Sequence, residues 1–192
     1  MTTAEMTAAP APMQDGFSAR GTLAIANAVM AALVGTLTLA WAAAGDGDQA
    51  LAMEKIGAFE GRAAFALFRS YHQALMLELL NDPEGAAEAY QSAMETSGGS
   101  SVRVVQAYAS FLSRHGRADE ARELLQAFVE ISADHALAQH DLAELAEKGT
   151  LPPVVENASE GVAEALYGLG SALAADTSSN LAELYLNRAL YM

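Results

Sequence analysis

The chain has 192 residues, carries 24 acidic and 10 basic residues for a formal net charge of −14, and contains no cysteine. Its hydrophobic content of 52% is too high for a disordered acidic chain, and its length suits one or two domains with a real core. The missing cysteines exclude a disulfide scaffold, a thiolate zinc site and a cysteine nucleophile. A pI near 4.5 argues against binding to nucleic acid, which depends on Lys and Arg.

Domain organisation follows from where apolar periodicity begins and where it is interrupted. Residues 1–16 are small, polar and proline-bearing, so we predict a mobile tail there. Residues 17–192 are expected to form one helical domain. Pro152 and Pro153 forbid a helix directly after Gly149, so residues 149–158 should form an irregular loop. The expected helices cover residues 22–44, 48–57, 60–80, 83–96, 101–115, 118–131, 134–148, 159–175 and 179–191.

The segment from Gly21 to Ala44 contains no Asp, Glu, Lys or Arg. As a helix it would be about 36 Å long, which is enough to span a bilayer core. It therefore has three interpretations, which are a packed helix of a soluble protein, a membrane anchor and a cleaved signal sequence. The many alanines, together with Asn27 and several threonines, favour the packed helix.

Helix-breaking residues recur at a nearly constant spacing along the chain. Gly45, Asn81, Gly116 and Gly149 lie 36, 35 and 33 residues apart. Each follows a helix-like stretch, and Gly or Asn at such a point tolerates the left-handed conformation that ends a helix. The first three precede a second helix-like stretch, which predicts a series of helical hairpins.

This pattern resembles the tetratricopeptide repeat, a helix-turn-helix unit of about 34 residues. The matching positions are Trp41, Gly45 and Ala50 in the first copy, Ala74, Ala86, Tyr90 and Ala93 in the second, Tyr108, Ala109, Leu112, Ala121, Leu125 and Phe128 in the third, and Leu169, Gly170, Ala182, Leu186 and Ala189 in the last. Glu54 departs from the pattern, because an aromatic residue usually stands there. The order of segments is also similar to that in longer tetratricopeptide proteins of alphaproteobacteria, whose role is poorly defined. The resemblance implies an all-α fold, a right-handed α-solenoid, over roughly residues 30–192.

Catalytic patterns are missing from the sequence. His135 and His140 are five residues apart, so they do not form the i, i+4 pair that a zinc site prefers. Gly168 and Gly170 lack the third glycine and the preceding strand of a dinucleotide-binding loop. We therefore expect no enzyme activity, no cofactor and no metal site.

The resemblance points instead to a binding groove. In tetratricopeptide proteins the first helix of each hairpin lines a concave groove that holds an extended peptide or a partner helix. The corresponding residues here are Tyr71, Leu75, Glu78, Arg103, Gln106, Ser110, Arg114, Gln139, Tyr167 and Ser171. Arg103 and Arg114 are eleven residues apart, so they share one helix face and could hold a carboxylate. The alternative is that both arginines only pair with nearby glutamates.

The predicted function is therefore a non-catalytic scaffold that binds a protein or peptide. The alternative is a membrane-anchored repeat protein of an envelope complex, with residues 21–44 as the anchor. The last helix carries Leu184, Tyr185 and Leu190 with no polar capping helix after it, so we expect either a fragment or self-association through that helix. From the sequence as it stands we expect a cytoplasmic location, and the alternative is a periplasmic or inner-membrane-anchored one.

Overall fold

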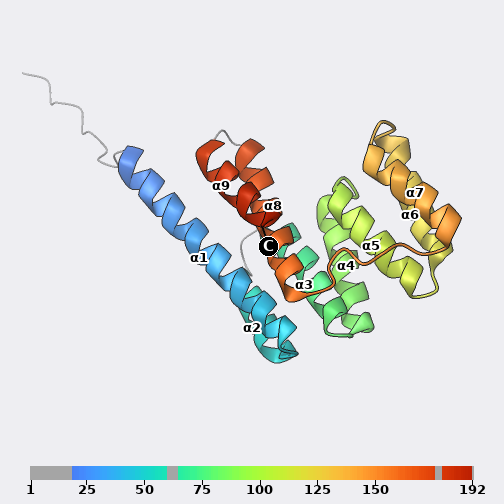
Figure 1. The fold of residues 1–192 in the computed structure, drawn as a ribbon, viewed down its shortest axis with the longest axis horizontal. Coiled ribbons are helices and arrows are strands. Elements are labelled where there is room, and N and C mark those ends of the chain that lie inside the picture. The colour runs from blue at the N-terminus through green and yellow to red at the C-terminus, as the bar shows by residue number, and fades with distance from the viewer. Residues whose placement is uncertain (1–18, 60–64, 176–178, 192) are drawn as a thin grey trace, which may run out of the picture. The chain divides into compact units, whose positions relative to one another are not determined.

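The computed structural model describes residues 19–59, 65–175 and 179–191, and every regular element in those ranges is helical. In chain order the α-helices are α1 (Ala19–Gly45), α2 (Gln49–Gly57), α3 (Ala66–Leu79), α4 (Pro83–Ser97), α5 (Val102–Arg114), α6 (Ala118–Ile131), α7 (Ala136–Lys148), α8 (Ala158–Ala175) and α9 (Ser179–Leu190) (Figure 1). The predicted all-α class is confirmed for these residues, and each expected helical range overlaps one of the helices. The predicted tail at 1–16 lies outside the described residues.

The chain divides into two compact units, Met1–Leu33 and Val34–Met192, so α1 contributes residues to both. The first unit is described only from residue 19 onward, where it is helical throughout. All of the contacts discussed below belong to the second unit. Among the described helices, none combines the length and the apolar character needed to cross a bilayer.

The turns between helices follow the expected chemistry at three of the four breaking points. Asn81, Gly116 and Gly149 take the left-handed conformation, with φ of 59°, 77° and 76°. The first breaking point differs, because Gly47 rather than Gly45 is left-handed there, with φ of 79°. Gly45 instead lies against α8, where an added Cβ would come within 2.7 Å of the Ala158 Cβ. Small size, not backbone freedom, is therefore what Gly45 contributes.

Neighbouring helices pack in pairs around a continuous core. α3 packs on α4, α5 on α6 and α8 on α9, and α7 packs on α6. Tyr90 of α4 is fully buried and stacks on Tyr108 of α5, with ring centroids 5.4 Å apart. This contact between successive pairs is of the kind that a repeat array needs, because each pair buries its apolar face only against its neighbours.

The last helix pair does not follow α7 in space. Residues 149–157 contain no helix, and they lead α8 back to α3 and α5, so that in the described residues α8 contacts α3 and not α7. Trp41 of α1 is fully buried under this helix, and a Cβ added to Gly161 would come within 2.2 Å of its indole ring. A strictly sequential stack of repeats would instead have placed α8 beside α7.

Candidate functional site

The predicted groove residues of α3 and α5 meet two charged clusters. We use the name groove face for the side of α3 and α5 on which Tyr71, Glu78, Arg103, Ser110 and Arg114 lie. In the first cluster two guanidinium nitrogens of Arg103 donate hydrogen bonds to the carboxylate of Glu164 of α8, and the distance from Arg103 Nε to Glu164 Oε1 is 2.9 Å. The Tyr71 hydroxyl donates to the same oxygen over 2.9 Å. Glu164 is only 11% exposed, so this pair holds α8 on the groove face more firmly than a surface ion pair would.

The second cluster lies three helical turns further along α5. Arg114 pairs with Glu78 of α3, whose other oxygen accepts a 2.8 Å hydrogen bond from the Tyr90 hydroxyl. Arg114 also lies within 3.4 Å of the Ser110 Oγ. Both arginines therefore pair with glutamates from other helices, and neither is a freely solvated surface cation. Arg114 takes its counter-charge from α3, whereas Arg103 takes it from α8.

Two buried serines of α5 hold the backbone of the irregular loop. Ser110 Oγ donates to the Pro152 carbonyl oxygen over 2.5 Å. Ser113 Oγ accepts a 3.0 Å hydrogen bond from the Leu151 N–H and donates to the Ser110 carbonyl oxygen over 2.9 Å. The loop therefore lies on the groove face, held through its main chain.

Burial and hydrogen bonding together set the protonation of Tyr71, Tyr90 and Arg103. Burial raises the pKa of Tyr71, and the nearby Glu164 carboxylate raises it further. Burial also raises the pKa of Tyr90, with Glu78 adding to the effect. For Arg103, burial alone would lower the pKa, but the hydrogen bonds to Glu164 and the neighbouring Tyr71 raise it overall. At neutral pH both tyrosines are therefore hydrogen-bond donors and Arg103 is charged, as the two clusters require.

The other predicted site residues lie at the margin. Gln139 is exposed, and its side-chain amide donates to the Ala133 carbonyl oxygen over 2.5 Å rather than reaching the groove face. Tyr167 is about half exposed, with the Arg103 Cζ 6.0 Å from its ring centre. Ser171 is exposed on α8. Of these, only Tyr167 adjoins the first charged cluster. Leu75, which the resemblance also placed on the groove, is buried in α3.

Three possible metal ligands lie together on α7, beside Gln106 of α5. In the described residues, His140, Asp141 and Glu144 bring one ligand atom each within 4.8 Å of one another. The Asp141 carboxylate accepts a 2.7 Å hydrogen bond from Gln106, and partial burial raises its pKa. Glu144 pairs with Lys148 over 2.7 Å. Both carboxylates already have hydrogen-bond partners and His140 is exposed, so these three side chains resemble an ordinary solvated helix face.

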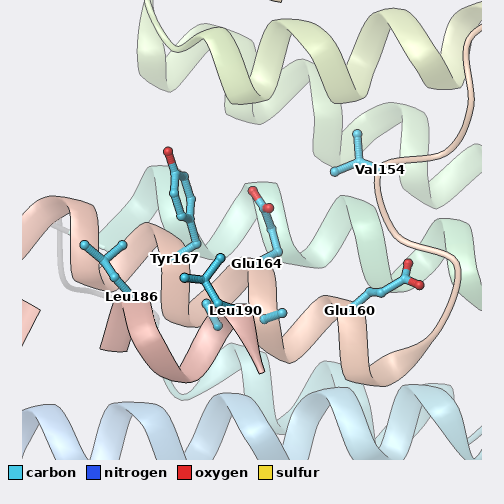
Figure 2. A pocket seen from close by; sticks show the side chains of 8 residues that line it. Val154, Glu160, Glu164, Tyr167, Leu186 and Leu190 are labelled. Carbon is cyan, nitrogen blue, oxygen red and sulfur yellow. The ribbon is translucent and has the colours of Figure 1, made fainter. Parts of the chain in front are cut away.

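An open cleft of about 420 Å³ lies between α8 and α9, next to the first charged cluster (Figure 2). Figure 2 shows Tyr167 and Glu164 of α8 above Leu186 and Leu190 of α9, with Val154 of the loop nearby. The outer end of α9 is apolar, since Leu190 is 82% and Tyr191 is 85% exposed. The residues lining the cleft are Val154, Glu160, Ala163, Glu164, Tyr167, Leu186, Ala189 and Leu190.

Three residues of the site were not predicted from the sequence: Glu164, Ser113 and Pro152. Glu164 carried a signal, because it is the only charged residue between positions 161 and 175. A single carboxylate in so apolar a helix implies a buried partner, since an unpaired buried charge is very unfavourable. Ser113 and Pro152 gave no such signal, because their roles depend on where the loop returns.

No protein-family model matches this chain, and no curated protein matches it either. The geometry of the site consists of two ion-pair clusters, a serine-held extended segment and an apolar cleft.

Proposed function

We propose that this chain is a non-catalytic interaction scaffold, built as a tetratricopeptide-like right-handed solenoid, whose groove face binds an extended segment of a protein partner. The observation that carries this proposal is the pair of hydrogen bonds that Ser110 and Ser113 form with the main chain of residues 152 and 151. Hydrogen bonds to a main chain are independent of the bound sequence, and neighbouring pockets then add specificity, as in other sites for extended peptides.

The distribution of charge supports a protein partner over a nucleic acid. Basic residues number ten against 24 acidic ones. The two arginines on the groove face already face carboxylates of the chain itself. Such a surface lacks the free cations that contact with phosphates requires.

Site-specific photo-crosslinking in the native cell tests this proposal. A photoreactive aromatic residue replaces Gln106, which lies on α5 between Arg103 and Ser110, and the control position is Ile131, which is 77% exposed at the end of α6. We expect a discrete adduct with another protein from position 106 and none from position 131. Identical adducts from both positions, or no adduct from 106, would contradict the proposal.

A second candidate is self-association through α9, which the exposed Leu184, Leu190 and Tyr191 favour. Exposed apolar side chains grouped on one helix are typical of a surface that another protein covers. Replacing Leu190 by Glu should then lower the mass found by light scattering at micromolar concentration. A monomeric mass for the unaltered chain would rule this candidate out.

A further inference from the structure

We propose that residues 151–164 are an internal ligand of the groove face, and that the external partner is a segment of the same chemistry that displaces them. This proposal rests on the groove function proposed above. The internal ligand consists of an extended apolar stretch, Leu151 to Val155, followed by the first turns of α8 up to Glu164. Its two kinds of contact, one through the main chain and one through a carboxylate, describe what a partner must offer.

The extended stretch is held like a bound peptide. Its end residues Leu151 and Val155 are buried, at 4% and 7% exposed, while Pro152 between them is exposed. Apart from the two serine contacts, little ties its main chain down, because prolines at positions 152 and 153 have no N–H to donate. Few main-chain bonds therefore hold the stretch, and the burial of Leu151 and Val155 supplies the rest of its attachment.

The carboxylate contact identifies the charge that a partner should carry. Arg114 has its carboxylate on α3, so it stays neutralised whether or not the internal ligand is bound. In the described part of the chain Arg103 is ion-paired with Glu164, so it loses this hydrogen-bonded partner when α8 leaves, and the nearby Asp141 of α7 offsets its charge only through space. A competing segment therefore needs a carboxylate in the place of Glu164, because an arginine left without a partner in this half-buried position is unfavourable.

The α8–α9 pair has contacts of its own that undocking leaves intact. The start of α8 is capped locally, where Asn157 accepts from the Glu160 N–H over 3.0 Å and Glu160 accepts from the Glu156 N–H over 2.7 Å. Gly170 lies so close to Leu186 of α9 that an added Cβ would come within 2.9 Å of its side chain. Release of the internal ligand therefore moves a preformed helix pair and does not unfold it.

Trp41 supplies a direct readout of this docking. It is the single tryptophan of the chain, is fully buried and lies against Gly161 of α8. When α8 leaves the groove face, the indole becomes exposed to water and its fluorescence emission shifts to the red. Docking can thus be followed without any added label on the protein.

The test uses a labelled synthetic peptide of residues 149–167, which contains no tryptophan, and the full chain. In the chain, Glu164→Gln weakens the contact between the internal ligand and Arg103 but leaves Arg103 itself in place. We expect the peptide to bind this variant about tenfold more tightly than the unaltered chain, because the loss of a charge-assisted bond raises the fraction of open molecules. Because the bound peptide brings its own Gly161 to the indole, Trp41 emission reports the open state of the chain only before the peptide is added.

Two controls isolate the cause. Glu120→Gln removes a similar two-donor arginine contact, from Arg117 on the surface of α6, and should leave peptide affinity unchanged. A peptide carrying the Glu164→Gln change should bind the open chain about tenfold more weakly than the unaltered peptide. Circular dichroism establishes that every variant is folded before binding is measured.

The outcomes separate this inference from the proposed function. Equal peptide affinity for the unaltered and Glu164→Gln chains refutes the internal ligand. The groove function survives that result if Arg103→Met abolishes binding. If Trp41 emission shows that the Glu164→Gln chain is open and the peptide still does not bind, both proposals fail. If the variant stays closed and binds nothing, α8 is a permanent cap and the internal ligand is refuted.

Discussion

Replacing Gly161 by alanine is expected to destabilise the protein, although alanine is the better helix former. A Cβ at this position would lie 2.2–2.4 Å from three atoms of the Trp41 indole, which is fully buried. Overpacking of this kind costs about 1–3 kcal/mol, whereas the change from Gly to Ala inside a helix gains at most about 1 kcal/mol. Because the contact is so short, the upper part of the overpacking range applies, about 2–3 kcal/mol, and subtracting about 1 kcal/mol for the helix preference leaves a net loss of about 1–2 kcal/mol.

A double-mutant cycle with Trp41→Leu tests the cause. Leucine removes the ring atoms that the new Cβ would meet, so Gly161→Ala should become neutral or stabilising by up to about 1 kcal/mol in that background. The matched control is Gly35→Ala, at an exposed position in α1 with no atom near its would-be Cβ, which should stabilise the chain in either background.

The assay is chemical denaturation followed by far-ultraviolet circular dichroism, because the Trp41→Leu variants have no tryptophan to report unfolding. For a chain of this length, a loss of 1–2 kcal/mol corresponds to a fall in Tm of about 2–8 °C. If Gly161→Ala changed stability by the same amount with and without Trp41, the close contact between α1 and α8 would not be the cause, and the reasoning would be wrong.

Three further predictions concern single buried or capping groups. Burial lowers the pKa of His72 from 6.5 to about 4, so the unfolded chain takes up a proton at this residue before the folded chain does as the pH falls. Between pH 7.5 and 5, the free energy of unfolding measured in urea should therefore drop by about 2 kcal/mol more in the unaltered chain than in His72→Gln. Ser113→Ala leaves the buried Leu151 N–H without an acceptor, so stability should fall by about 1–3 kcal/mol and hydrogen exchange at Leu151 should speed up; unchanged exchange would contradict the assigned bond. Asp82→Ala removes the cap on the Gly85 N–H and should lower Tm by an amount equivalent to about 1 kcal/mol, whereas Asp82→Asn should retain most of the stability.

The helices could be predicted from the sequence because their ends are set locally. Asn81 followed by Asp82 and Pro83 combines a left-handed helix end, a side-chain cap and a first-turn proline, and the structure uses all three. The first turn differs from the prediction by two residues, because Gly47 takes the left-handed conformation expected of Gly45.

The return of α8 to α3 could not be predicted in the same way. Pro152 and Pro153 indicate where the helical array is interrupted, but nothing local in an extended stretch indicates its direction. The pairing of Arg103 with Glu164 spans 61 residues and depends on that direction. The shared face of Arg103 and Arg114 was visible from their spacing, whereas their partners were two among 24 acidic residues.

The two residues 149 and 150, between the end of α7 and Leu151, have a consequence of their own, because they tether the internal ligand to its receptor surface. A tether of this length keeps the ligand at an effective concentration in the millimolar range, so a free partner must exceed a threshold set by geometry as well as by affinity. Doubling the tether with inserted Gly and Ser residues would lower that concentration about threefold. The loop is thus the place where the sensitivity of the protein to its partner could be adjusted without altering a single contact.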